Sequence, residues 1–216
     1  MIAIPWAQIT SLDQALEQLV LAARQLPADS LPFRLGGDTP AAIEKRSQAL
    51  ERPIPEPICR MYEVIRGFKG FPSTGDKSVF LWDLSEVRWV DPAEELYVEG
   101  GPHERWQHSH YLAFGQSEFG DTLTYVVDPP IGTPGSVVML DHEVQGPDCE
   151  AQPPNIVFYA DSLAQWLARW TAQQFEEFGF LAGVIPELPD PLSSQLKADH
   201  MRLNQGEAMN WVFDPK

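Results

Sequence analysis

The sequence has few cysteines, few basic residues and no long apolar run, and each scarcity excludes a class of protein. Its two cysteines, Cys59 and Cys149, lie far apart and lack the spacing of a zinc site, so we expect reduced thiols. No segment approaches the roughly 20 apolar residues of a membrane span. The amino terminus has no basic lead, which argues against a secretory signal. The expected location is the cytoplasm, without a membrane partner.

Basic residues are outnumbered by acidic ones. The chain has 15 Lys and Arg against 31 Asp and Glu, a formal net charge of −16 and a sequence pI of about 4.5. Such a charge repels phosphate backbones, so nucleic acid is excluded as the expected partner. It would speed the encounter with a basic protein. The alternative that the acidity serves only solubility stays open.

Hydrophobic residues make up 44% of the 216 residues, enough for a core without metals or disulfides. Apolar residues at helical spacing predict helices over 12–26, 39–50 and 57–67, and another from 163 onward. Ser11, Thr39 and Ser162 are suitable N-caps, and Ser11 and Ser162 each precede a glutamine by three residues, as in a capping box. Phe175 and Phe178 continue the apolar stripe of the last helix.

Between the third and the last helix the pattern changes to short apolar runs rich in aromatic and β-branched residues, which predict strands. The short connections favour an antiparallel meander. Helices, then strands, then a helix indicate an α+β fold, with a mostly antiparallel sheet packed against amphipathic helices. The runs are 79–82, 87–90, 108–114, 122–127, 136–140 and 155–159.

The sequence contains only weak signals for catalytic or metal-binding residues. His108 and His110 would share one face of a strand, and Asp141 with His142 could join them in a metal site, but this convergence rests on no pattern in the sequence. No nucleophile elbow and no phosphate-binding glycine loop is present. The adjacent carboxylates 94–95 and 176–177 are typical of solvated faces. We therefore assign no catalytic, cofactor or metal residue, and keep the histidine site as an alternative.

A binding surface is the stronger hypothesis. Acidic residues concentrate in the stretch 83–104, with aromatic residues between them, a composition typical of protein interfaces. Trp82 and Trp89 are expected in the core, whereas Trp106 lies in a polar loop and is expected to be exposed. The residues assigned to partner binding are Asp83, Glu86, Asp91, Glu94, Glu95, Glu99 and Trp106.

Several blocks occur in the order seen in one protein superfamily. A helix at 41–50, a proline step at 53–57 and a second helix at 58–65 ending in Arg66-Gly67-Phe68 form the first block. Later blocks are a strand with a Gly-Asp turn, two paired strands and a closing helix, at 111–115, 119–121, 125–128, 137–142 and 159–167. With these blocks, residues 39–170 resemble the SUKH superfamily, the Smi/Knr-like proteins, which include fungal cell-wall regulators and bacterial toxin-immunity proteins. The run after Arg66 departs from the family, in which Asn often flanks the helix glycine.

The resemblance implies a Smi/Knr-like α+β domain that binds proteins and has no established catalytic residues. We place this domain at 39–178, after an N-terminal helical extension and linker at 1–38 and before a C-terminal tail at 179–216. Gly120 is expected to supply the positive φ of the turn, and Asp121 the hydrogen bonds that hold it. The expected function is that of an immunity-type protein that neutralises a basic toxin, such as a nuclease. A regulatory scaffold of the Smi/Knr type is the main alternative.

Overall fold

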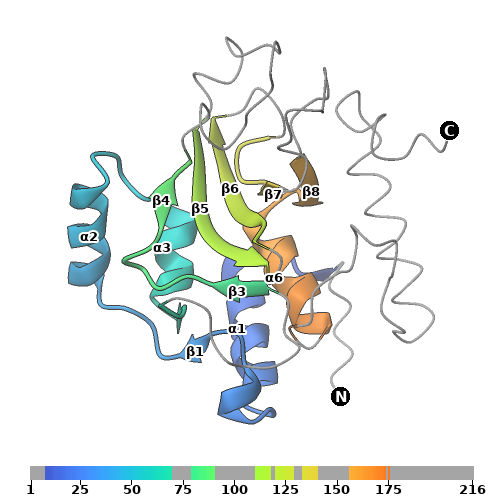
Figure 1. Ribbon diagram of the computed structural model, residues 1–216. Coiled ribbons are helices and arrows are strands. Elements are labelled where there is room, and N and C mark those ends of the chain that lie inside the picture. The colour runs from blue at the N-terminus through green and yellow to red at the C-terminus, as the bar shows by residue number, and fades with distance from the viewer. Residues whose placement is uncertain are drawn as a thin grey trace, which may run out of the picture.

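The computed structural model describes residues 8–69, 79–90, 110–117, 120–128, 133–140, 156–173 and 175. Within these residues, helices pack against an antiparallel sheet (Figure 1), which confirms the predicted α+β fold. In the part of the chain that the structure describes, no helix combines the length and apolar character that crossing a membrane requires.

The main sheet has six strands in the order β3-β5-β6-β7-β8, and β4 also pairs with β5. Every pairing is antiparallel, and β5 to β8 form the meander that the short connections predicted. The strands are β3 (Val79–Leu81), β4 (Arg88–Trp89), β5 (His110–Ser117), β6 (Thr122–Asp128), β7 (Val137–Leu140) and β8 (Ile156–Ala160).

Side chains on both faces of this sheet are buried. Leu112 and Phe114 of β5 belong to the main core, whereas Tyr111 and Ala113 alternate with them and belong to a smaller cluster. This alternation follows from the two-residue period of a strand. Trp89 packs against the main core and Trp82 against the smaller cluster, and both are half-buried. The two tryptophans are therefore part of the packed interior, as the sequence indicated.

Two capped helices, α1 (Leu12–Ala23) and α6 (Leu163–Ala172), pack against each other in the main core. At the start of α6 the Ser162 hydroxyl accepts a hydrogen bond from the Gln165 N–H at 3.2 Å. The Ser11 hydroxyl caps α1 in the same way at 3.3 Å. These contacts satisfy N–H groups that have no partner within a helix, which explains why the serine positions marked both helix starts.

The segment interpreted as a linker contributes to the core. It contains the short helix η2 (Ala28–Ser30) and the strand β1 (Arg34–Leu35), and Leu31 and Phe33 are buried. The Phe33 ring lies 4.9 Å from the ring of Phe175, which follows the end of α6 with a φ of +66°. The helix that begins at Leu163 therefore ends at Ala172 and does not continue through Phe175.

The third helix is shorter than its apolar spacing indicated. α3 spans Glu56–Tyr62, and residues 65–66 form the strand β2 (Ile65–Arg66), which pairs with β1. The prediction that this helix continues to Gly67 was wrong, because Ile65 enters the core from a strand paired with Leu35. Gly67 permits a close approach: a Cβ there would lie 2.0 Å from the Trp82 carbonyl oxygen.

The helix α2 (Pro40–Ala49) lies at the outer edge of the described part, beside β4 (Figure 1). Its N-cap, Thr39, accepts a hydrogen bond from the Ala42 N–H at 3.2 Å, as predicted. Only Ile43 of this helix is buried, and the Arg46 guanidinium donates to the Val87 carbonyl oxygen at 3.1 Å. One side of α2 is thus attached to the rest of the fold through Ile43 and Arg46, and the other side is exposed. The third helix, α3, lies beside α2.

Candidate functional site

An open groove of about 530 Å³ lies where α2, the proline-rich turn after it and α3 meet. Its apolar surface includes Ile43 and Ile54, both buried, and the half-buried Cys59. The remaining lining residues are Pro40, Glu44, Ser47, Gln48, Glu51, Arg52, Pro53 and Glu63.

The walls of the groove are held by specific hydrogen bonds. The Ser47 hydroxyl accepts from the Ile54 N–H at 3.1 Å and so joins α2 to the segment before α3. The Cys59 thiol donates to the Ile54 carbonyl oxygen at 3.4 Å. Arg60 of α3 forms an ion pair with Asp13 of α1 at 2.9 Å. The first two contacts join α2, the proline-rich turn and α3 around the groove.

Carboxylates dominate the charge of the groove. Glu44, Glu51 and Glu63 are exposed, and Arg52 is the one basic residue in the lining. The Arg52 guanidinium lies over the Trp89 ring, 5.7 Å from its centre, which fixes the position of this positive charge. Glu63 is already paired with Arg60 of α3, at 3.0 Å. The carboxylates of Glu44 and Glu51 therefore remain for a ligand that carries positive charge beside an apolar group.

Glu51 adopts a backbone conformation that most residues avoid. It follows the last helical residues of α2 with a φ of +57°, the position where helices commonly end in glycine. A non-glycine residue in this region carries strain of about 1 kcal/mol. The side chain at this position is a carboxylate that lines the groove.

The thiol of Cys59 reports the negative potential in the groove. Burial raises the pKa of Cys59, and the nearby carboxylates of Glu63, Glu56 and Glu44 raise it further. A raised pKa keeps the thiol protonated and poorly nucleophilic at neutral pH.

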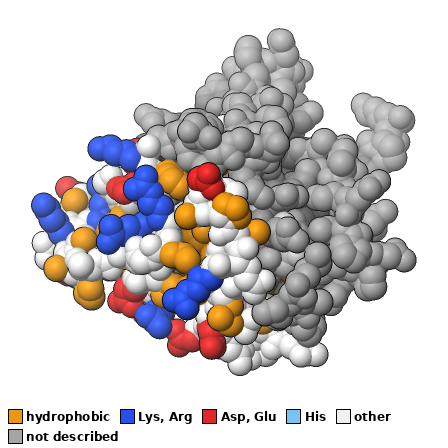
Figure 2. All heavy atoms as spheres, turned by 90° about the horizontal axis from the view of Figure 1, so that it is seen from below, with side chains coloured by type: hydrophobic (Ala, Val, Ile, Leu, Met, Phe, Trp, Pro, Cys, Tyr) orange, Lys and Arg blue, Asp and Glu red, His pale blue; other side chains and the backbone are white. Residues whose placement is uncertain are grey.

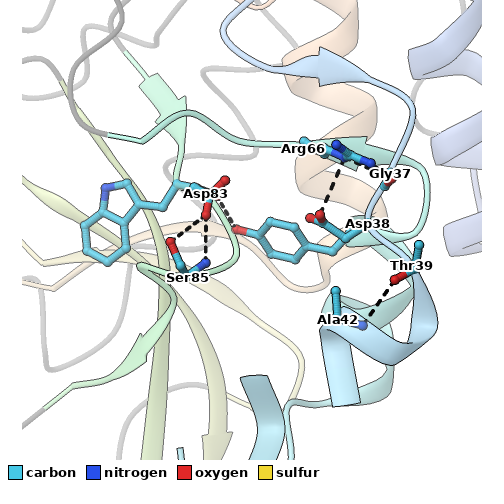
Figure 3. A network of polar contacts seen from close by, with 9 residues as sticks. Gly37, Asp38, Thr39, Ala42, Arg66, Asp83 and Ser85 are labelled. Atoms are coloured by element: carbon cyan, nitrogen blue, oxygen red, sulfur yellow. Dashed lines mark hydrogen bonds and ion pairs between the residues drawn. The ribbon is translucent and has the colours of Figure 1, made fainter. Parts of the chain in front are cut away.

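A polar network adjoins the groove at the start of α2 (Figure 3). The Asp38 carboxylate points toward Arg66, with 3.5 Å between the charged atoms, and Arg66 also donates two hydrogen bonds to the Gly37 carbonyl oxygen, at 2.8 and 2.9 Å. Burial raises the pKa of Asp38 above its ordinary value, and the negative charge of Asp83 adds to this, although Arg66 opposes both. The network joins β1, β2 and α2.

Tyr62, the last residue of α3, connects this network to the sheet. Its hydroxyl donates to the Trp82 carbonyl oxygen at 2.7 Å, and the Phe114 carbonyl oxygen lies 3.3 Å away. Burial raises the pKa of Tyr62 well above 10.0, and the negative charges of Asp83 and Asp38 act in the same direction. The hydroxyl therefore stays protonated near neutral pH and links α3 to the sheet as a hydrogen-bond donor.

Asp83, assigned to partner binding from the sequence, shapes the turn between β3 and β4. Its carboxylate accepts hydrogen bonds from the Ser85 N–H at 2.9 Å and the Ser85 hydroxyl at 2.6 Å (Figure 3). Partial burial would raise the pKa of Asp83, but the hydrogen bonds from Ser85 and the positive charges of Lys69 and Arg34 outweigh it, so this pKa lies below its ordinary value. The carboxylate thus has a local structural role.

Asp83 and Glu86 do not form a uniformly acidic surface. Arg88 lies over the Trp82 ring, 5.4 Å from its centre, and Arg34 lies over the Phe68 ring at 4.9 Å. Figure 2 shows one face of the molecule, on which Lys and Arg side chains lie among Asp and Glu side chains. The described part of the predicted acidic stretch is thus of mixed charge.

The other residues assigned to partner binding, Asp91, Glu94, Glu95, Glu99 and Trp106, lie outside the described residues, so their placement stays a prediction. His108 and His142 lie outside them as well, and His110 begins β5 opposite Asp128. In the described ranges, no three His, Cys, Asp or Glu side chains converge as metal ligands would.

Gly120 and Asp121 form the turn between β5 and β6. Gly120 has a φ of +98°, a conformation that favours glycine. Asp121 is buried, and its carboxylate accepts a hydrogen bond from the Ser117 hydroxyl at 2.9 Å. The Ser117 hydroxyl in turn accepts from the Asp121 N–H at 3.1 Å. This exchange fixes the end of the hairpin.

The groove was not predicted from the sequence. The signal available was the proline step between two helices, flanked by Glu44 and Glu51 before it and by Glu63 after it. Helical spacing alone does not reveal that these carboxylates share a surface, because the turn that joins the helices decides how they meet. No model of a known protein family matches the chain, and no curated protein matches it.

Proposed function

We propose that the chain is a non-catalytic protein-binding domain that captures a basic toxin and neutralises it by covering its active surface. The observation that carries the proposal is the α2–α3 groove, whose lining combines exposed carboxylates with apolar side chains. The net charge of −16 supports the same class of partner. The resemblance to the SUKH superfamily supports toxin immunity, with a nuclease as the kind of basic toxin expected.

The groove suits both steps of capture. Exposed carboxylates such as Glu44 and Glu51 steer a positively charged protein into contact, which raises the association rate. Buried apolar surface at Ile43 and Ile54 then slows dissociation, the step that sets most differences in affinity. Neutralisation by coverage needs only this complementarity and no reaction.

The acidic stretch 83–104 remains a second part of the proposed contact surface. The turn role of Asp83 makes this residue a poor candidate for contact, so the proposal rests on the later residues of the stretch. Replacing Glu94, Glu95 and Glu99 together with glutamine is expected to weaken toxin capture. Unchanged affinity would remove this stretch from the surface and leave the groove.

The test is neutralisation of a captured protein. The tagged full chain is used to capture partners from its source cells, and each captured protein is then expressed alone and together with the chain. We expect a basic protein that stops growth when expressed alone, and normal growth when the chain is present. If the specifically captured protein is harmless and not basic, the toxin-capture proposal fails. This result would favour the alternative of a regulatory scaffold.

A further inference from the structure

The α2–α3 groove is too small for a whole helix or domain of a partner. Its volume of about 530 Å³ lies in the range of roughly 300–1,000 Å³ that single small ligands occupy. A few side chains fill such a space. The part of a partner that enters the groove is therefore a few side chains, which a loop or a chain end can present.

The chemistry of the lining defines that element further. Ile43 and Ile54 offer a buried apolar surface, so an apolar side chain at the centre of the occupant would exclude water there. Glu44 and Glu51 lie at exposed positions, and neither has an ion-pair partner among the described residues. The Glu44 carboxylate accepts a hydrogen bond from the Gln48 side chain at 2.9 Å. Positively charged side chains next to the apolar one would pair with these two carboxylates, which both come from α2 and its C-terminal end.

We propose that the groove between α2 and α3 binds a short loop or terminal segment of the basic partner, in which Arg or Lys side chains adjoin an apolar side chain. This inference rests on the proposed function and adds the part of the partner that is recognised. Arginine is the better match, since its planar guanidinium can bind a carboxylate through two hydrogen bonds.

Cys59 makes the proposal measurable, because its thiol lies in the groove. The Cys149→Ser protein leaves Cys59 as the only thiol. Because the raised pKa makes Cys59 react slowly at neutral pH, the rate of its alkylation by iodoacetamide is measured in alkaline buffer, with and without a synthetic peptide Gly-Arg-Leu-Arg-Gly. We expect alkylation to slow about tenfold at a peptide concentration near ten times its Kd, because bound peptide covers the thiol.

The peptide controls separate the contributions of charge and apolar contact. Gly-Glu-Leu-Glu-Gly and Gly-Arg-Gly-Arg-Gly are expected to protect Cys59 much less than the arginine–leucine peptide. Spermine tests whether any small cation suffices. Equal protection by spermine or by the acidic peptide would overturn the proposal, and so would an unchanged rate with the arginine–leucine peptide up to its solubility limit.

Two charge variants locate the contact. In E44Q/E51Q the protection by the arginine–leucine peptide should be lost, whereas E17Q/D29N removes the same charge from exposed positions outside the groove and should keep it. Equal protection in both variants would contradict the assignment. A neutralised toxin that leaves Cys59 fully reactive would overturn the inference and preserve the proposed function, whereas failure to neutralise any toxin would overturn the function itself.

Discussion

At the scale of single residues, three polar groups have structural roles. The Tyr62 hydroxyl, the Asp83 carboxylate and the Asp121 carboxylate each hold backbone or side-chain donors and acceptors at the end of a strand or helix. Tyr62 and Asp121 are buried, and unpaired each of them would carry a desolvation penalty of about 1–3 kcal/mol. Their hydrogen bonds therefore explain why polar residues occur at these positions without invoking catalysis.

Replacing Tyr62 with phenylalanine tests the structural role of its hydroxyl through the stability at high pH. The folded state holds the Tyr62 proton at pH values where the unfolded chain has lost it, so the wild-type protein should lose stability as pH rises above 10.0. Y62F should be about 1 kcal/mol less stable near neutral pH and should lack this contribution to the alkaline decline. Urea unfolding of both proteins, near neutral pH and above pH 10.0, measures the free energy of unfolding. Parallel alkaline declines in the two proteins would contradict the assignment.

Replacing Asp83 with alanine separates a structural role from a binding role. Since the folded-state pKa of Asp83 is lowered, its contribution is present above its ordinary pKa of 3.8 and is lost as pH falls through the folded value. D83A should lower the free energy of unfolding by about 1 kcal/mol at neutral pH and flatten the acid decline. Toxin affinity should stay unchanged. Weakened affinity with unchanged stability would restore Asp83 to the contact surface.

At the scale of elements, helix starts were predictable, whereas the ends of α3 and α6 were not. Ser11, Thr39 and Ser162 lie at the observed N-caps, because a capping side chain acts within a few residues of itself. The end of α3 depends on Ile65 pairing with Leu35, a contact between distant residues that helical spacing cannot reveal. The apolar side chain is buried in either conformation, so its presence did not distinguish helix from strand.

The end of α2 provides a prediction in which stability and binding change in opposite directions. Glu51→Gly removes the strain at φ +57° and should raise the free energy of unfolding by about 0.5–1 kcal/mol. It also removes a groove carboxylate and should weaken toxin binding. E51Q, which keeps the strain and loses the charge, is the matched control for binding. A stabilised E51G protein with full affinity would show that the carboxylate has no role.

The close approach of Gly67, which follows β2, to Trp82, which follows β3, provides another prediction about stability. In Gly67→Ala the added Cβ would meet the Trp82 carbonyl oxygen at 2.0 Å, and we expect a loss of about 3 kcal/mol in unfolding free energy. Gly36→Ala is the control, because nothing lies within 4 Å of its Cβ and only its φ of +88° opposes the change. Gly36→Ala should lower the free energy of unfolding by about 1 kcal/mol. Equal losses in thermal or urea unfolding would argue against the close contact.

At the scale of the whole molecule, composition indicated the class of the protein better than the location of its site. The hydrophobic content and the change from helical to strand patterns were sufficient for the α+β fold and the antiparallel meander. The net charge indicated a basic partner but not the surface that receives it. That surface depends on how α2 and α3 meet across Pro53 and Pro55, and such a contact is a property of the folded chain.

The most direct measurement of toxin capture by the α2–α3 groove is the affinity of the captured toxin for E44Q/E51Q and for E17Q/D29N, by titration calorimetry. Both variants lose two negative charges, so a general effect of net charge is the same in each. We expect the groove variant to bind at least about tenfold more weakly, a difference of about 1.4 kcal/mol, and the control variant to bind like the wild-type chain. Equal affinities of the two variants would contradict capture through the groove.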